Sequence, residues 1–276
     1  MPNILKFKGN QSFHFLSDLI RQGFNYQELD LSEVNFITPL IVVITKLSMY
    51  KGQKIHLPID HQAHQYLQYM SATQKYTSSY IPCYHIMHEN DIWPVTKIFL
   101  GLFEHFVNPT TLRDLSYTFS ELMENVFHHA QSQEGLFIHA QKYDHLGFLE
   151  VAIIDLGIGI EKSLKENPVF SNLDDMSAFI KAFEIGVTRN PMGNAGEGLT
   201  SIKWWIESNF DAEGVIISNK YMWFKILTSN KSVANFNERP FIVWPGTLIW
   251  LKIPREPKKS LLDIWESLGL TSEIRI

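Results

Sequence analysis

The sequence predicts a two-domain protein of the α/β class, on three observations. The chain has 276 residues, 45% of them hydrophobic, which is enough to fill the core of one large domain or of two modest ones. A strand-like stretch at 28–32, a helical stretch at 38–52 and a strand-like stretch at 53–59 make a βαβ pattern. From residue 95 onward, longer helical and strand-like stretches alternate.

The first domain is expected over 1–72. Its central helix begins at Thr38-Pro39 and ends at Gly52, as a helix start with proline and a helix end with glycine predict, and a second helix follows at 60–71. The next stretch is polar, rich in tyrosine and carries two prolines. An inter-domain linker is therefore expected over 73–94.

The second domain is expected over 95–255, and it opens with helices at 95–107 and 110–130. The second helix has an apolar stripe at spacings of three and four, formed by Leu112, Leu115, Phe119, Leu122 and Val126. At 100° per residue, Glu121 and Asn125 lie about 40° apart at the margin of this stripe, whereas Glu124 points further away. The two side chains can therefore converge on one ligand.

The rest of this domain is predicted from shorter patterns. The expected elements are strands at 135–143 and 147–157, a short helix at 174–185, a helix beginning near Gly198, and three strand-like runs of which the last is 246–254. The C-terminal tail, 256–276, is amphipathic and is expected to form a helix that packs back on the domain.

Four separated motifs follow one another in this second domain, and each alone is common. They are Glu121-x-x-x-Asn125, Asp155-Leu-Gly157-Ile-Gly159, Gly196-Glu197-Gly198-Leu199, and Gly246-Thr247. Their joint order and spacing over about 95–255 resemble the ATP-binding domain shared by gyrase, Hsp90-type chaperones, histidine kinases and MutL proteins, the GHKL or Bergerat fold. The resemblance implies a two-layer α/β sandwich with a mixed sheet that binds ATP and Mg²⁺.

The resemblance also implies roles for the helical pair. Asn125 matches the family asparagine that holds magnesium, and an amide oxygen is a neutral hard ligand for a hydrated Mg²⁺ bridging the phosphates. Glu121 matches the carboxylate that orients and deprotonates an attacking water or hydroxyl, so it is the candidate general base.

The glycine-rich motifs are expected to surround the nucleotide. Asp155 would accept a hydrogen bond from the adenine amino group, with Gly157 and Gly159 allowing a tight turn beside the base and Thr247 helping the aspartate. The phosphates would be held at a helix start that reads Gly196, Gly198 and Leu199.

The segment between Ile160 and Gly196 would be a lid, in which Arg189 is either a γ-phosphate contact or a solvated loop residue. The glycine motif departs from the pattern usual in histidine kinases, because Thr200 replaces a glycine and Glu197 adds a carboxylate near the phosphates. These departures are expected to reduce nucleotide affinity or turnover.

Two further resemblances narrow the expected subfamily. The Asn-x-x-x-His-Ala pattern that ends at His129-Ala130 resembles bacterial anti-sigma serine kinases. Residues 1–72, with Asp-Leu-Ser at 30–32, resemble the STAS fold of anti-sigma antagonists, in which a serine at the helix start is phosphorylated. This chain has Thr38-Pro39 at that place, so whether Thr38 accepts phosphate stays open.

The functional expectation is an Mg-ATP-binding regulatory protein. It would act as a serine/threonine protein kinase or an ATPase switch on a protein partner, either STAS-like or a sigma-type regulator, and it could form a homodimer. The alternative is a non-catalytic interaction module in which nucleotide sets the affinity for the partner.

Composition argues against other classes. A net charge of −5 and a pI near 6.1 leave no basic footprint for nucleic acid. The longest apolar run, around 36–47, is too short to cross a bilayer. With Cys83 the only cysteine and no signal-peptide layout at the N-terminus, a cytoplasmic location is expected.

The spacing of the histidines permits the hypothesis that they bind a metal ion, but this hypothesis is disfavoured. The pair His128-His129 and the spacings His61-x-x-His64 and His85-x-x-His88 could place two imidazoles on one side, but no third ligand is evident. A sensor histidine kinase is also disfavoured, because the 37 residues from His88 to Asn125 are too few for the usual helical hairpin.

Overall fold

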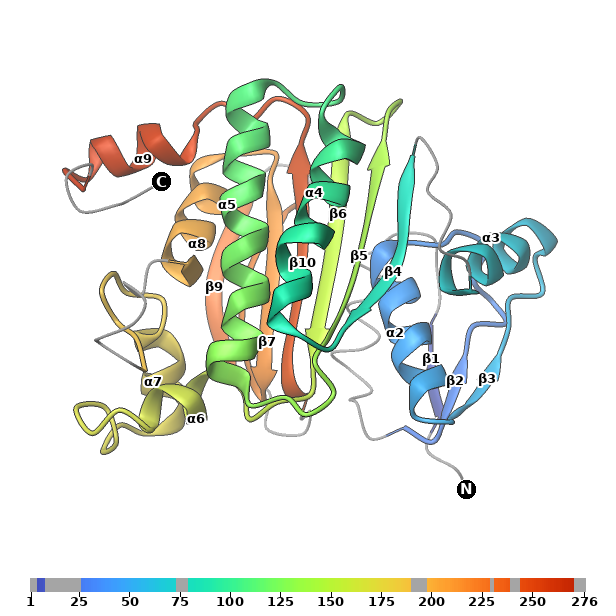
Figure 1. The fold of residues 1–276 in the computed structure, drawn as a ribbon, viewed down its shortest axis with the longest axis horizontal. Coiled ribbons are helices and arrows are strands. Elements are labelled where there is room, and N and C mark those ends of the chain that lie inside the picture. The colour runs from blue at the N-terminus through green and yellow to red at the C-terminus, as the bar shows by residue number, and fades with distance from the viewer. Residues whose placement is uncertain are drawn as a thin grey trace.

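The structure is a computed structural model that describes residues 4–7, 26–72, 79–189, 198–228, 231–238 and 244–270. Two sheets of unequal size organise it (Figure 1). The larger has seven strands in the order β4-β5-β6-β10-β7-β8-β9, and the smaller has three in the order β1-β2-β3. The protein is therefore a mixed α/β protein in which an antiparallel sheet is joined to a small parallel one.

The N-terminal elements build the small sheet and its helices. They are β1 (Ile4–Lys6), β2 (Glu28–Asp30), α2 (Pro39–Tyr50), β3 (Lys54–His56) and α3 (His61–Ala72). The expected βαβ unit is thus present as β2-α2-β3, and β1 is an additional strand that pairs in parallel with β2.

The larger sheet and its helices take up the rest of the described chain. Its first elements are β4 (Tyr80–Ile86), the 3₁₀ turn η1 (Glu89–Asp91), α4 (Ile92–Phe103), α5 (Pro109–Asn125), the π-helical turn η2 (Val126–Ala130), β5 (Leu136–Tyr143) and β6 (Phe148–Asp155). Then come α6 (Ile160–Lys165), α7 (Asp175–Lys181), α8 (Gly198–Ser208), β7 (Glu213–Asn219), β8 (Tyr221–Leu227), β9 (Ser232–Glu238), β10 (Trp244–Pro254) and α9 (Leu261–Ser267).

The expectation of a mixed large sheet was wrong. All six pairings between neighbouring described strands of the large sheet are antiparallel. Short hairpins join β5 to β6 and β7 to β8, and β10 inserts between β6 and β7. Strand direction depends on where a returning strand inserts, and the pattern of apolar residues along one strand carries no such information.

The stretch expected to link two domains belongs largely to the sheet. Of residues 73–94, the part described in the structure, 79–94, contains β4, η1 and the start of α4. The strand β4 forms the outer edge of the large sheet and pairs with β5 alone, with a register shift between Ile81 and Tyr84. Pro82 lies inside this irregular stretch, and an edge strand tolerates proline because one side of its backbone needs no partner.

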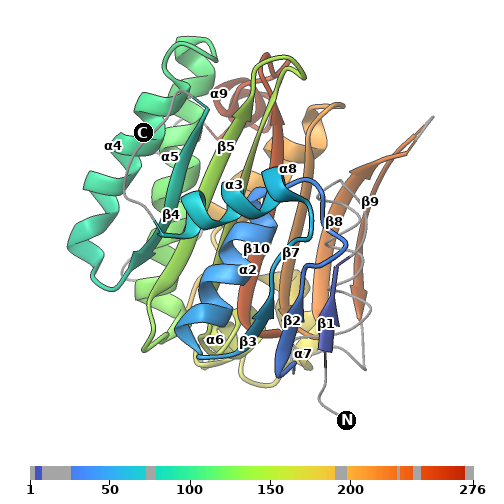
Figure 2. The same ribbon diagram turned by 90° about the vertical axis from the view of Figure 1, so that its right-hand side faces the viewer.

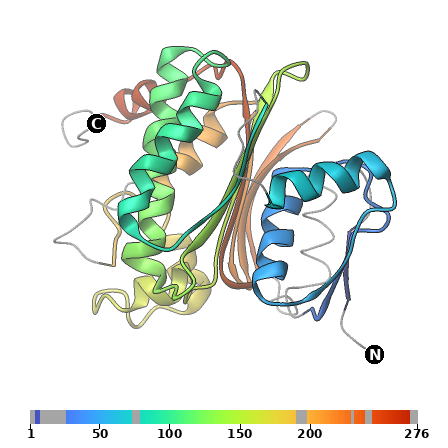
Figure 3. The same ribbon diagram turned by 45° about the vertical axis from the view of Figure 1, so that its right-hand side comes forward.

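Helix α2 lies between the two sheets, as Figure 3 shows edge-on and Figure 2 from the side of the small sheet. From Pro39 to Thr45 every side chain is buried, as expected for a helix that is covered on both sides, and only the last turn, with Met49 and Tyr50, is exposed. One hydrophobic cluster joins Leu29 and Ile41 of the N-terminal part to Phe137, Ile154 and Trp250 of the large sheet. The two parts therefore share a continuous core.

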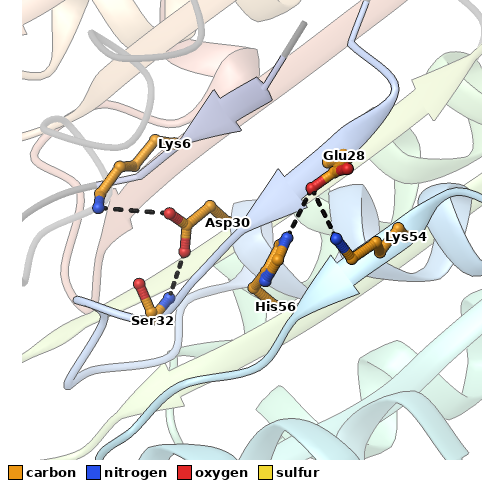
Figure 4. Close-up of polar contacts among 6 residues, drawn as sticks. All are labelled: Lys6, Glu28, Asp30, Ser32, Lys54 and His56. Atoms are coloured by element: carbon orange, nitrogen blue, oxygen red, sulfur yellow. Dashed lines mark hydrogen bonds and ion pairs between the residues drawn. The ribbon is translucent and has the colours of Figure 1, made fainter. Parts of the chain in front are cut away.

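The small sheet has one apolar and one charged face. Leu5 and Leu29 are buried and belong to the shared core. The alternate positions form a charged ladder (Figure 4), in which Lys6 Nζ lies 3.3 Å from Asp30 Oδ2 and Glu28 Oε2 lies 2.7 Å from His56 Nε2. Opposite charges on neighbouring strands stabilise the pairing modestly.

Helices α4, α5 and α8 cover the other face of the large sheet. Helix α5 begins with an N-cap at Asn108, whose side chain accepts a hydrogen bond from Thr111 N at 2.8 Å, followed by proline at the first helical position. The expected packing of the tail is confirmed for α9: Leu261 N donates to Asp114 Oδ2 at 3.0 Å and Trp265 Nε1 donates to Ser201 Oγ at 3.2 Å. Within the described ranges, every helix is too short or too polar to traverse a lipid bilayer.

Candidate functional site

A pocket of about 100 Å³ lies at the C-terminal end of β6, between α5, α6 and α8. It brings together residues that are far apart in the chain. The predicted residues that line it are Glu121, Asn125, Asp155, Gly159, Gly198, Leu199 and Thr247. Gly157 does not line the pocket; it packs against Ala130, which does. Gly196 lies outside the described residues.

The walls of the pocket are mainly apolar. They are formed by Leu122, Val126, Ile153, Ile160, Leu164, Val187, Leu199 and Ile249. By a comparable measure a single water needs roughly 10–15 Å³, so the space suits a group several waters in size. An apolar pocket with a few placed polar groups is the usual form of a small-molecule site.

Asp155 is the buried acid of this pocket, with 3% of its surface exposed. Its Oδ1 accepts a hydrogen bond from Gly157 N at 2.7 Å, and Thr247 donates from both its hydroxyl and its backbone N–H. Burial raises the pKa of Asp155 to about 6, and the hydrogen bonds from Gly157 and Thr247 offset this only in part. At neutral pH the residue is a carboxylate with capacity to accept a further donor.

Gly246 brings the backbone of β10 close to this acid. The register of β10 with β7 shifts between Trp244 and Thr247, and Gly246 in that bulge has φ +90°. A Cβ at Gly246 would lie 2.4 Å from the Asp155 carbonyl oxygen and 2.6 Å from its Oδ1, so only glycine fits. The bulge is what allows the Thr247 N–H and hydroxyl to reach the carboxylate.

The turn after Asp155 is fixed on two sides. Ile158 N donates to the Ala130 carbonyl at 2.7 Å, and a Cβ at Gly157 would lie 2.1 Å from the same oxygen. Gly159 has φ +88°, and a Cβ there would meet Asn219 Nδ2 at 2.4 Å. Both positions therefore require glycine, because the Ala130 backbone and the Asn219 side chain leave no space for a Cβ.

A buried polar network around Glu161, which sequence reasoning missed, supports the turn that follows Asp155. Glu161 accepts hydrogen bonds from Ser218 Oγ at 2.8 Å and from Asn219 Nδ2 at 2.5 Å. Ser218 Oγ in turn accepts from Ile160 N at 2.7 Å. Asn219 has φ +48° at the β7–β8 hairpin. An asparagine between two strand-like runs indicates such a hairpin turn, and it is the one weak sequence signal for the network.

Glu121 and Asn125 lie against the first residue of α8. A Cβ at Gly198 would be 2.6 Å from Glu121 Oε2 and 3.4 Å from Asn125 Nδ2. The two side chains therefore share one margin of α5, as the helical spacing predicts, and the glycine lets the N-terminus of α8 approach them. Glu124 does not line the pocket; burial is the main cause of its raised pKa.

The last turn of this helical stretch widens into a π-helix, η2, a feature often found at functional sites. It turns His129 towards the pocket, where Nδ1 is buried with no hydrogen-bond partner in the described chain. Burial, with the nearby His128 and Arg189, lowers the pKa of His129 to about 4, so its ring is neutral at neutral pH. His128 points outward and its Nε2 lies 2.8 Å from Glu89 Oε1.

The hypothesis that the histidines bind a metal ion gains no support from the described residues. No group of three or more histidine, cysteine, aspartate or glutamate side chains that could hold a metal exists among the described residues. His61 is exposed and lies 3.4 Å from Gln65 Nε2, while His85 Nε2 contacts the Glu134 carbonyl at 2.7 Å.

Arg189 is the basic side chain among the described residues that line the pocket. Its Nε lies 2.7 Å from Glu166 Oε2, and Nη1 donates to the carbonyls of His128 and His129 at 3.3 and 3.5 Å. The loop arginine is therefore held in place, whereas the sequence left open whether it is solvated.

Thr38, the residue considered as a phosphoacceptor, lies away from this pocket. It precedes α2, is 1% exposed, and its hydroxyl has no hydrogen-bond partner in the described chain. A hydroxyl so buried is not accessible to a kinase in this conformation.

No protein-family model matches the chain, and no curated protein is similar to it at a significant level.

Proposed function

We propose that the chain binds an adenine nucleotide with Mg²⁺ in this pocket and acts as a regulatory switch on a protein partner. In this proposal the large sheet with α4, α5 and α8 is an ATP-binding sandwich of the GHKL type, and the N-terminal part is STAS-like. The observation that carries the proposal is the convergence of Asp155, Thr247, Glu121 and Asn125, from three separate elements, on one largely apolar pocket.

The buried acid suits an adenine ring. Its carboxylate already accepts from Gly157 and Thr247, and an exocyclic amino group would supply a further donor, which stabilises the ionised form. A guanine presents a carbonyl oxygen at the corresponding position, and this would face the carboxylate without a proton between them. The apolar walls would contact the two faces of the base.

The pair on α5 suits the other end of a nucleotide. Asn125 would hold Mg²⁺ through its amide oxygen, and the ion would neutralise phosphate charge beside Glu121. Glu121 would accept the proton of an attacking hydroxyl, either a serine or threonine of the partner or a water. The N-terminus of α8, at Gly198, offers backbone N–H groups to an anion.

A non-catalytic nucleotide-gated interaction module is the second candidate. Thr200 favours it, because this side chain in the first turn of α8 is buried and its hydroxyl has no partner in the described chain. A buried threonine where phosphate-binding helices commonly carry glycine restricts the approach of a ligand to the backbone.

Calorimetric titration with ATP and GTP, with and without Mg²⁺, tests the binding site. Asn125→Ala should remove the magnesium-dependent part of ATP affinity, whereas Asn235→Ala on the exposed strand β9 should leave it intact. Equal ATP affinity with and without Mg²⁺ in the native chain, together with equal GTP affinity, would reject the site.

Turnover separates the two candidates. Phosphate release and labelling of a partner should fall at least tenfold in Glu121→Gln, while Glu124→Gln on the same helix should match the native chain. If the native chain binds ATP but both variants and the native chain show only background turnover, the non-catalytic module is the function.

A further inference from the structure

Glu166, the residue that follows α6, connects two segments at the margin of the pocket. Its Oε2 lies 2.7 Å from Arg189 Nε, and its Oε1 accepts a hydrogen bond from Gln131 Nε2 at 2.8 Å. Gln131 follows η2 directly and has φ +53°. One carboxylate therefore ties the end of the α5–η2 helical stretch to the loop that carries Arg189.

Arg189 has a second set of contacts on the same helical end. Its Nη1 donates to the carbonyls of His128 and His129 in the last turn of η2. A guanidinium at a helix C-terminus satisfies carbonyls that lack helical partners. Arg189 thus caps the turn that places His129 in the pocket.

The charges around the pocket are unfavourable for an anion in this arrangement. Two acids line it, Glu121 and Asp155, and Arg189 is the basic side chain among the described lining residues. The Glu166 carboxylate neutralises that arginine. A guanidinium binds carboxylate and phosphate with the same paired geometry, so the two anions compete for it.

We propose that Glu166 is a built-in competitor of the ligand phosphates, which holds Arg189 until a phosphate takes the arginine over. The inference rests on the proposed nucleotide function and adds a means of regulating that site. Transfer of Arg189 to phosphate frees the Glu166 carboxylate from the guanidinium and removes the Arg189 contacts to the η2 carbonyls, whereas Gln131 keeps its own hydrogen bond to Glu166. Occupation of the phosphate position is thereby communicated to the end of the helical stretch that carries Asn125 and His129.

The size of the expected effect follows from exposure. The Arg189 and Glu166 side chains are 29% and 39% exposed, so solvent screens their attraction. Removing an exposed ion pair of this kind changes an equilibrium by roughly two- to five-fold. Because the pair competes with the ligand, its removal should strengthen binding, which is the opposite of what loss of a contact residue does.

The test is a titration of native chain and Glu166→Gln with Mg-ATP and with adenosine, at low and high salt. The glutamine keeps the size and an acceptor oxygen but removes the charge. We expect Mg-ATP to bind two- to five-fold more tightly at low salt, with a smaller gain at high salt, and adenosine affinity to stay unchanged. Glu184→Gln is the matched control, because Glu184 is an exposed partner of Lys181 that does not line the pocket.

A double-mutant cycle with Arg189→Ala tests whether Glu166 acts through Arg189. The gain from Glu166→Gln should disappear when Arg189 is already alanine. Unchanged Mg-ATP affinity in Glu166→Gln, or an equal gain for adenosine or for Glu184→Gln, overturns the competitor role and leaves the proposed function standing. A native chain that binds neither Mg-ATP nor adenosine overturns the proposed function itself.

Discussion

Gly198, the first residue of α8, lies directly against Glu121 of α5. A Cβ added to the glycine would stand 2.6 Å from Glu121 Oε2 and 3.1 Å from Glu121 Cβ. The carboxylate end could rotate away, but the Cβ belongs to the fixed part of α5. The two helices therefore approach as closely as they do because one of them carries no side chain at the contact.

Gly198→Ala is expected to reduce function more than stability. The added methyl group must displace the Glu121 carboxylate, and we expect turnover, or nucleotide affinity where no turnover occurs, to fall at least tenfold. The control is Gly101→Ala in α4, where a Cβ would meet nothing within 4 Å. That change should stabilise the fold by about 0.5–1 kcal/mol with no functional effect. Equal effects of both variants in thermal melts and binding assays would contradict the contact.

Asp155→Asn is expected to stabilise the protein at alkaline pH while it weakens nucleotide binding. The folded pKa of Asp155 is about 6, above the ordinary value of 3.8, so its contribution to stability is fully present below pH 3.8 and is lost as pH rises through 6. Each pKa unit corresponds to about 1.4 kcal/mol, so the buried charge costs up to about 3 kcal/mol at pH 8. Urea unfolding of both proteins at pH 5 and pH 8 measures this. A gain no larger at pH 8 than at pH 5 would argue against the buried charge.

Nucleotide affinity is expected to depend on pH through the same residue. The ionised carboxylate accepts the hydrogen bond of the adenine amino group more strongly than the protonated acid does, so ATP affinity should fall as pH drops below about 6. His129, with a pKa of about 4, titrates well below this range. Fluorescence titrations between pH 5 and pH 8 should show the dependence in the native chain and its absence in Asp155→Asn. A pH dependence that persists in the variant would assign it to another group.

His139→Leu is expected to protect the fold against acid. His139 is fully buried on β5, and neither ring nitrogen has a well-formed hydrogen bond in the described chain. Burial lowers its folded pKa to about 3. The free energy of unfolding is therefore unaffected by His139 above the ordinary pKa of 6.5, and it decreases as pH falls below that value. At pH 5 the ring is protonated in the unfolded chain but stays neutral in the folded one, which lowers the free energy of unfolding by about 2 kcal/mol relative to pH 8.

The measurement for His139 is a comparison of melting temperatures at pH 5 and pH 8. The native chain should lose more stability on acidification than His139→Leu does, and His61→Leu at an exposed position should behave like the native chain. Parallel losses in all three proteins would show that other groups govern acid stability.

The sequence predicted those parts of the molecule that depend on local periodicity. The 3.6-residue repeat located α5 and placed Glu121 beside Asn125, and the structure finds both in one pocket. The strand before Asp155 and the glycines after it also lie as the pattern predicts. Each of these features follows from residues within a few positions of one another.

The features that the sequence did not predict depend on distant partners. Edge strand β4 was assigned to a linker because Pro82 and its polar neighbours break the strand pattern, and only pairing with β5 makes it a strand. The Glu161–Ser218–Asn219 network joins residues nearly sixty positions apart. The antiparallel direction of every neighbouring pair in the large sheet likewise depends on chain topology.

The position of α2 between two sheets also decides what can be cut from this protein. A fragment starting at residue 79 would present Phe137, Ile154 and Trp250 on the reverse side of its sheet to water, and a fragment ending at residue 72 would bare the opposite flank of α2. Exposed apolar areas of this kind promote aggregation. The two portions therefore have to be kept together in one chain for these apolar surfaces to stay buried.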